Sequence, residues 1–253
     1  MKALDILYGI HPVREAIRAG KRQIHSVTFT PEKPSQRLLE IRELAAEKGI
    51  PVLTASVDHL RARAKSGGHQ GVVAEATPCE VLGQEALWEI GDAGSASPFL
   101  LVTDSITDPM NLGALIRTAL AVGVHAVITP KDRSAPPTPA VSSASAGALE
   151  HIRLVQAVNL VRTLQALKEK GFWIFGLDHR ARQDCFHTDF TGPSALVIGG
   201  EGKGIRPLVK KTCDHLVSIP QQGAVVSLNA SVAGAVVMYE AYRQRMNTGR
   251  EQK

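Results

Sequence analysis

Two short apolar strands, each followed by an unusual loop, constrain this chain most strongly. Leu196–Ile198 is an apolar run bounded by glycines, which is typical of a buried strand. It leads into Gly199–Ile205, where four glycines within six positions allow positive φ and close approach of backbone to a ligand. A second apolar strand, His215–Ile219, ends in Pro220 and a polar loop. We expect both loops at the carboxyl edge of a parallel sheet, the edge where open α/β sheets bind ligands.

The glycine loop matches neither common nucleotide-binding fingerprint. The dinucleotide pattern G-x-G-x-x-G fails because Ile205 stands at the last glycine position. The phosphate-loop pattern fails because Lys203 is followed by Gly204 rather than by a hydroxyl residue. Taken alone, the loop is also compatible with a tight turn between a strand and a helix, and Ser227 and Asn229 with ordinary helix caps.

A third segment makes the combination specific. Asn111–Arg117 has the pattern Asn-x-Gly-x-x-x-Arg, and it precedes the glycine loop and the Ser227–Asn229 segment. In order and spacing the three segments resemble the motifs of the SPOUT superfamily, in its SpoU/TrmH branch of RNA ribose 2′-O-methyltransferases. Leu7–Val13 and His69–Val72 resemble the RlmB-type subgroup, which methylates a guanosine ribose in 23S ribosomal RNA of the large subunit. The resemblance covers nearly the whole chain.

The resemblance implies a cofactor and a set of site residues. The methyl donor would be S-adenosyl-L-methionine, which carries its own electrophile, so that neither a metal nor a covalent enzyme intermediate is required. The family also implies a C-terminal trefoil knot and a homodimer with the site at the subunit interface. The implied cofactor-binding residues are Gly199, Gly200, Ile219 and Leu228. The implied catalytic residues are Asn111, Arg117, Glu201, Ser227 and Asn229.

Arg117 is the only Lys or Arg between Pro109 and Pro130. A lone arginine in so apolar a stretch either extends its head to solvent or serves a site, and the family resemblance favours the site. Family accounts treat the matching arginine as the base that takes the ribose proton. A guanidinium stays protonated in proteins, so we expect Arg117 to bind phosphate and stabilise developing negative charge instead.

The chain divides into an N-terminal α/β part and a larger α/β part. Residues 1–76 predict a compact basic domain, similar in the family to ribosomal-protein-type RNA-binding domains, and residues 77–98 predict a linker. From Phe99 onward, apolar strands alternate with helical segments, which predicts a mostly parallel sheet with helices on both faces. We place the catalytic domain at 99–247 and a tail at 248–253.

Several classes of protein are disfavoured by composition. The chain has no 18-residue apolar run, and charges occur throughout its first twenty residues, so neither a membrane helix nor a signal peptide is expected. Three scattered cysteines fit a reducing cytoplasm rather than disulfides or zinc. The histidines lack metal-ligand spacing, and Asp104 and Asp108 each suggest a local turn or capping role. We therefore expect no metal, no membrane and a cytoplasmic location.

Charge is unevenly distributed along the chain. Residues 1–76 carry net +4, residues 77–130 net −5 and residues 131–253 net +6. The two basic parts could contact RNA phosphates or could be ordinary solvated surface. Ser66–Gln70 predicts a flexible loop that could grip RNA or be only a turn. Lys131–Ser145 predicts a mobile basic loop near the site, which could order RNA on binding or be a bare surface loop. The lysine that usually precedes the family's Gly-Ala-x-Glu segment is absent before Gly147.

The predicted activity is S-adenosylmethionine-dependent methylation of a guanosine ribose 2′-hydroxyl in 23S ribosomal RNA. The nearest alternative is a transfer RNA ribose methyltransferase, a branch that generally lacks an N-terminal domain. A non-catalytic RNA-binding protein is disfavoured by the intact set Asn111, Arg117, Glu201 and Asn229. A nucleotide-dependent oxidoreductase is disfavoured by the failed fingerprint.

Overall fold

The computed structural model describes residues 4–92, 97–223 and 227–248. It divides into two compact units: unit 1 is Met1–Glu80 with Pro136–His151, and unit 2 is Val81–Ala135 with Ile152–Lys253. Unit 1 therefore contains the predicted domain 1–76 and a later segment that the prediction assigned to the catalytic domain. Within the described residues, no helix combines the length and apolar character that a membrane crossing requires.

Unit 1 is built on a mixed four-stranded sheet in the order β1-β4-β2-β3. Strand β4 is antiparallel to both β1 and β2, and β3 is parallel to β2. The strands are β1 (Asp5–Tyr8), β2 (Ile24–Phe29), β3 (Val52–Thr54) and β4 (Val72–Ala76). The helices are α1 (Ile10–Ala19), α2 (Gln36–Glu47) and α3 (Val57–Ala64).

Apolar residues of unit 1 pack on both faces of this sheet. Val27, Phe29 and Val72 form one core with residues of α1 and α2, such as Val13 and Ile41. On the other face, Val73 packs against Leu60 and Ala64 of α3. Strand β4 alternates between the two cores, as expected for the two-residue period of a strand.

The loop predicted to be flexible, Ser66–Gln70, is held by local hydrogen bonds. The Gln70 side chain accepts a hydrogen bond from the Ile10 N–H (3.0 Å), at the first turn of α1, where Gly9 offers no side-chain cap. His69 is buried, and its Nδ1 accepts a hydrogen bond from the Gly71 N–H (3.1 Å). Side chains of this loop thus satisfy backbone donors at the start of α1 and within the loop itself.

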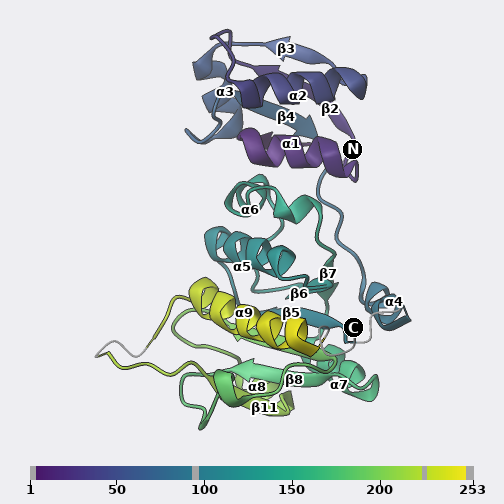
Figure 1. The fold of residues 1–253 in the computed structure, drawn as a ribbon. Coiled ribbons are helices and arrows are strands. Elements are labelled where there is room, and N and C mark those ends of the chain that lie inside the picture. The colour runs from purple at the N-terminus through teal and green to yellow at the C-terminus, as the bar shows by residue number, and fades with distance from the viewer. Residues whose placement is uncertain (1–3, 93–96, 224–226, 249–253) are drawn as a thin grey trace. The chain divides into compact units, whose positions relative to one another are not determined.

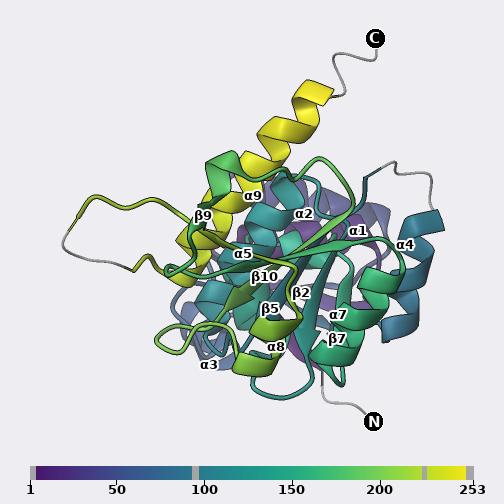
Figure 2. The ribbon, with the colours of Figure 1, turned by 90° about the horizontal axis from the view of Figure 1, so that it is seen from below.

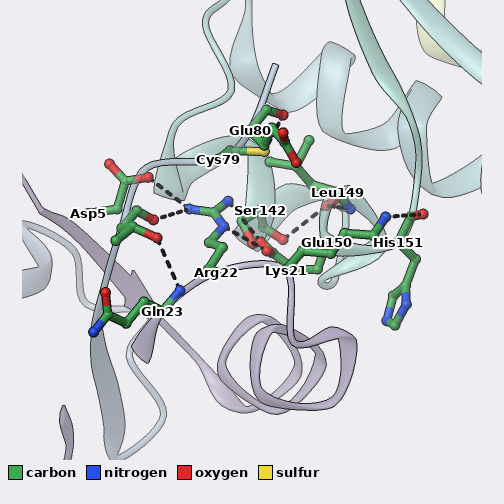
Figure 3. A network of polar contacts seen from close by, with 12 residues as sticks. Asp5, Lys21, Arg22, Gln23, Cys79, Glu80, Ser142, Leu149, Glu150 and His151 are labelled. Atoms are coloured by element: carbon green, nitrogen blue, oxygen red, sulfur yellow. Dashed lines mark hydrogen bonds and ion pairs between the residues drawn. The ribbon is translucent and has the colours of Figure 1, made fainter. Parts of the chain in front are cut away.

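The mobile basic loop predicted at Lys131–Ser145 is helical over Pro139–Ala144, and segment Pro136–His151 packs within unit 1. It contains α6 (Pro139–Ala144) and a short 3₁₀ helix, η2 (Ala148–Glu150). Glu150 accepts hydrogen bonds from Arg22 Nε (2.7 Å) and Nη2 (3.0 Å), and from Ser142 Oγ (2.8 Å) (Figure 3). Arg22 Nη1 also donates to Asp5 Oδ2 (2.8 Å). Two buried charges are thus paired with good geometry, the condition under which such burial is tolerated.

Unit 2 contains a seven-stranded sheet in the order β7-β6-β5-β10-β8-β11-β9. Every pairing among the described strands is parallel, which confirms the predicted mostly parallel sheet. The strands are β5 (Phe99–Asp104), β6 (Ala126–Pro130), β7 (Leu154–Ala157), β8 (Trp173–Leu177), β9 (Gln183–Asp184), β10 (Ser194–Gly199) and β11 (His215–Ser218).

Helices cover both faces of this sheet (Figure 1). On one face, Val197 belongs to a core with residues of α7 and α8, such as Leu164 and Val209. On the other face, α5 and α9 run side by side (Figures 1 and 2) and contact each other. The helices are α4 (Trp88–Asp92), α5 (Pro109–Ala121), α7 (Leu160–Glu169), α8 (Pro207–Thr212) and α9 (Ala230–Thr248), with 3₁₀ turns η1 (Gln84–Leu87) and η3 (Cys185–His187).

Gly234 allows α9 to lie close to its neighbours within the subunit. A Cβ atom at this position would clash with Ile198 Cδ1 of β10 and with Leu115 Cδ2 of α5, because each lies 2.5 Å from where the Cβ atom would be. The absence of a side chain at Gly234 therefore serves the packing of α9 on β10 and α5.

Candidate active site

The glycine loop folds back on the end of β10, and two glycines make this possible. A Cβ atom at Gly199 would overlap the Gly204 carbonyl carbon and the Ile205 nitrogen. A Cβ atom at Gly200 would overlap the Ser105 carbonyl oxygen. The Gly204 N–H donates to the Gly200 carbonyl (2.9 Å), which closes the loop. The loop is therefore a tight turn, and it also borders a cavity.

A cavity of about 390 Å³ opens beside this loop, at the carboxyl edge of β8 and β10. Its size lies within the range of ~300–1,000 Å³ that is usual for small-molecule pockets. Residues of the glycine loop and of the segment after β11 both contribute to its wall, as expected for two loops at one edge. Of the residues predicted for the site, those in the wall are Gly199, Gly200, Glu201, Ile219, Ser227 and Leu228. Residues 224–226 of the motif lie outside the described part of the chain.

Three polar side chains from the three motifs meet beside the cavity. Asn111 Nδ2 donates to Glu201 Oε1 (3.1 Å), and Asn229 Nδ2 donates to the same oxygen (2.6 Å) and to Asn111 Oδ1 (2.8 Å). The Asn229 Oδ1 atom accepts from the Ser231 and Val232 N–H groups (2.9 and 3.2 Å). Asn229 is therefore a helix cap and a member of this network, because its amide oxygen and nitrogen serve different partners.

Asp108 places Asn111 at the start of α5. Its carboxylate accepts hydrogen bonds from the Met110 and Asn111 N–H groups (3.1 and 3.2 Å), and Pro109 occupies the first helical turn. This confirms the capping role expected for Asp108. Asn111 itself is 8% exposed, so its amide is directed inward to the network rather than to solvent.

Arg117 neither lines the cavity nor joins the network beside it. It is exposed, it does not line the cavity, and within the described residues it forms no hydrogen bond or ion pair. Asn111 precedes it by six positions, and six residues turn an α-helix by about 240°. The two side chains therefore leave α5 in different directions.

Residues that follow β8 also line the cavity, and the sequence analysis missed them. They are Asp178, His179 and Arg180, and Lys210 of α8 lies in the wall as well. Burial raises the pKa of Asp178, but hydrogen bonds from Lys210 Nζ and the Arg180 N–H outweigh it and hold the pKa below its usual range. The missing information was strand order, because β8 lies between β10 and β11 and delivers a third loop to the same edge.

The described residues offer neither a metal cluster nor a reactive thiol. No group of three or more His, Cys, Asp or Glu in this part of the chain is placed to hold a metal ion. Burial raises the pKa of the Cys79 and Cys185 thiols to about 11 and that of Cys213 to about 12. These thiols are protonated at neutral pH and are not nucleophiles.

Comparison with known families decides the assignment. Residues 98–239 match the SpoU rRNA Methylase family, and residues 6–82 match the substrate-binding domain of RNA 2′-O ribose methyltransferases. The chain belongs to the SpoU family. Both units of this SpoU protein are therefore represented among known proteins, and the Asn111, Glu201 and Asn229 network lies within the matched methylase region.

Relatives of this SpoU protein match over nearly its full length. The 23S rRNA (guanosine-2′-O-)-methyltransferase RlmB of Pseudomonas putida is 42% identical over 245 residues, which cover 97% of this chain and 98% of the relative. The putative TrmH family tRNA/rRNA methyltransferase YacO of Bacillus subtilis is 39% identical over 245 residues, which cover 97% of this chain and 98% of YacO. The crystal structure of the methyltransferase AviRb of Streptomyces viridochromogenes with AdoMet aligns with a TM-score of 0.77 at 26% identity, covering 96% of this chain and 90% of AviRb.

A shorter relative aligns with only part of the chain. The TrmH/SpoU tRNA modifying enzyme of A. aeolicus covers 66% of this chain and 84% of its own, with a TM-score of 0.56 and 27% identity. The alignment thus leaves about a third of this SpoU protein uncovered.

Proposed function

We propose that this protein methylates the 2′-hydroxyl of a guanosine ribose in 23S ribosomal RNA, with S-adenosylmethionine as methyl donor. The observation that carries the proposal is the match to RlmB of P. putida over both units, at 42% identity and with 98% of that enzyme covered. The match of residues 6–82 to a substrate-binding domain of RNA 2′-O ribose methyltransferases supports an RNA substrate for unit 1.

The residues of the cavity fit the proposed cofactor. S-adenosylmethionine supplies an electrophilic methyl group when bound. Gly199 and Gly200 carry no side chain, so the cavity wall at these positions is backbone alone, while Ile219 and Leu228 add apolar surface to the same wall. The structure of AviRb with AdoMet supports this cofactor for a relative at 26% identity.

The polar network would position the ribose beside this cavity. Because Glu201 accepts from two amides, its carboxylate is fixed in direction while remaining at the cavity wall. We propose that Asn111, Glu201, Ser227 and Asn229 position the ribose for removal of its 2′-hydroxyl proton. The proton acceptor would be water, a phosphate oxygen or Glu201.

Arg117 requires a second subunit in this proposal. Since Arg117 is exposed and does not line the cavity of its own chain, we propose a homodimer in which it serves the site of the other subunit. Exposed apolar side chains along α9 support such an interface: Val232, Tyr239, Tyr242 and Met246 are 50, 53, 38 and 42% exposed. The trefoil knot implied by the family remains a prediction.

A transfer RNA substrate is the alternative. It is disfavoured because two tRNA-modifying relatives align with only part of this chain. The A. aeolicus enzyme covers 66% of this chain, and a structure of an enzyme for 2-OH methylation of C/U34 on tRNA covers 60% of it and 99% of its own length. This chain also carries the match of residues 6–82 to a substrate-binding domain of RNA 2′-O ribose methyltransferases. With ribosomal RNA as the substrate, we propose a cytoplasmic location.

Mapping of the product tests the proposal. The purified protein would be incubated with labelled S-adenosylmethionine and either 23S rRNA or bulk tRNA, and 2′-O-methyl positions would be mapped by resistance to alkaline hydrolysis. We expect one guanosine in 23S rRNA to be modified. Transfer to tRNA alone would favour the alternative, and binding of RNA without any transfer would favour a non-catalytic protein.

A further inference from the structure

One aspartate outside the cavity holds both ends of the glycine loop. Asp104 is the last residue of β5 and pairs in register with Gly199 of β10. Its backbone carbonyl accepts a hydrogen bond from the Gly200 N–H (2.8 Å), where the loop begins. Its carboxylate accepts from the Arg206 N–H (2.7 Å) and from Arg206 Nε (2.6 Å), where the loop ends. The expectation of a merely local turn role for Asp104 was wrong.

The backbone around Asp104 leaves the loop little freedom. Ser105 has a φ of 66°, in the left-handed region that is uncommon for residues other than glycine. Its carbonyl oxygen lies where a Cβ atom of residue 200 would otherwise be. The loop is thus in contact with the turn after β5 on one side and attached to the Asp104 carboxylate on the other, and both constraints act on the segment that carries Glu201.

The carboxylate must be paired because it is fully buried. The Asp104 side chain is 0% exposed, whereas that of Arg206 is 36% exposed. A buried charge without a partner costs far more than a paired one, and both oxygens of Asp104 have partners on Arg206. Folding of the chain around Asp104 therefore selects the loop conformation in which Arg206 stands beside this carboxylate.

We propose that Asp104 is a positioning residue for the cofactor, acting through the glycine loop without touching the ligand. The inference rests on the proposed function, because it takes the cavity beside the loop as the S-adenosylmethionine site. Asp104 does not line that cavity, but Gly199, Gly200, Glu201 and Ile205, which it holds in place, all do. Loss of the carboxylate should release the end of the loop at Arg206 and allow conformations that close or reshape the cavity wall.

The chain offers a matched control at the opposite edge of the same sheet. Asp214 accepts a hydrogen bond from the Ile174 N–H (2.9 Å) and pairs with Lys168 Nζ (2.7 Å), so it also joins a backbone N–H and a cation. It precedes β11 and lies at the amino edge, and it does not line the cavity. Asp104→Asn and Asp214→Asn therefore remove similar charges from the two ends of the sheet.

The test compares cofactor affinity and turnover for wild type, Asp104→Asn and Asp214→Asn. Calorimetry would measure the dissociation constant of S-adenosylmethionine, at a temperature where thermal unfolding shows every variant folded. Methylation of 23S rRNA would give kcat and KM for the cofactor. We expect Asp104→Asn to raise the dissociation constant at least tenfold, a loss of about 1.4 kcal/mol, and to raise KM in step. Asp214→Asn should leave both within about twofold of wild type.

Wild-type affinity in a folded Asp104→Asn protein would overturn the inference, as would an equal loss in Asp214→Asn. If Asp104→Asn does not fold, Arg206→Met provides the same test from the more exposed partner, since it keeps the backbone N–H bond and removes the Nε bond. Unchanged affinity in Arg206→Met would then overturn the inference. A wild-type protein that neither binds S-adenosylmethionine nor methylates RNA would instead refute the proposed function.

Discussion

Replacing Glu150 with glutamine should destabilise unit 1 by about 3 kcal/mol. The side chains of Glu150 and Arg22 are 1 and 2% exposed, and Glu150 accepts three hydrogen bonds from Arg22 and Ser142. Breaking a buried ion pair by removing one partner costs ~3–5 kcal/mol, because the remaining charge has no compensation. Arg22 would keep Asp5, which is 21% exposed (Figure 3), so we expect the lower end of this range.

Hydrogen exchange is the appropriate assay because the chain has two units and its unfolding need not be two-state. Amides of α6 and η2 should exchange about 150-fold faster in Glu150→Gln. Each 1.4 kcal/mol corresponds to a factor of about ten, and the expected loss is about 3 kcal/mol. Glu40→Gln is the matched control in the same unit: Glu40 pairs with Arg18, and their side chains are 35 and 44% exposed. An exposed pair contributes about 0–1 kcal/mol. Equal effects of the two substitutions would refute the reasoning from burial.

Three further predictions concern the proposed site and assembly. Arg117→Lys should lower single-turnover methyl transfer by ~10²–10³ with unchanged cofactor affinity, because lysine lacks the planar fork; recovery of the rate above the pKa of the new lysine would show that residue 117 acts as a base. Asp178 has a lowered pKa in the folded state, so its contribution to stability is full above its unfolded value of about 3.9 and is lost as pH falls through the lower folded value. The difference in the free energy of unfolding between wild type and Lys210→Met, measured with urea, should therefore be constant near neutral pH and disappear in acid. A difference that persists in acid would contradict this. Tyr239→Glu on the exposed side of α9 should give monomers in sedimentation and abolish methylation, whereas an active monomer would contradict a site shared between subunits.

Local patterns predicted most of the elements. The glycines that bound Leu196–Ile198, the cap at Asp108 and the alternation after Phe99 each depend on neighbours in sequence, and the structure contains β10, α5 and an all-parallel sheet among the described strands. The two apolar strands predicted that their loops meet at one edge of the sheet, and the resemblance to the SpoU family added the site residues. Six of the predicted site residues line the cavity.

Pairings between distant residues could not be predicted in this way. Asp104 and Arg206 are separated by 102 positions, and Arg22 and Glu150 by 128. Each of these residues is explicable locally: Asp104 as a turn residue, Arg22 as part of a basic surface. The periodicity of a strand or helix states which face is buried, but not which charge on another element shares that environment, and strand order was equally inaccessible. The loop after β8 was missed for that reason.

The Asp104–Arg206 pair also explains why a short motif is an incomplete description of this site. The glycines at 199 and 200 allow the loop to lie against the turn after β5. They do not favour this conformation over others, because glycine is compatible with many backbone conformations. One loop conformation is favoured only by an interaction that the other conformations lack. The hydrogen bonds from Arg206 to the fully buried Asp104 carboxylate are such an interaction. A chain with every glycine of the motif and no partner for Asp104 should therefore keep the family pattern and still bind its cofactor poorly.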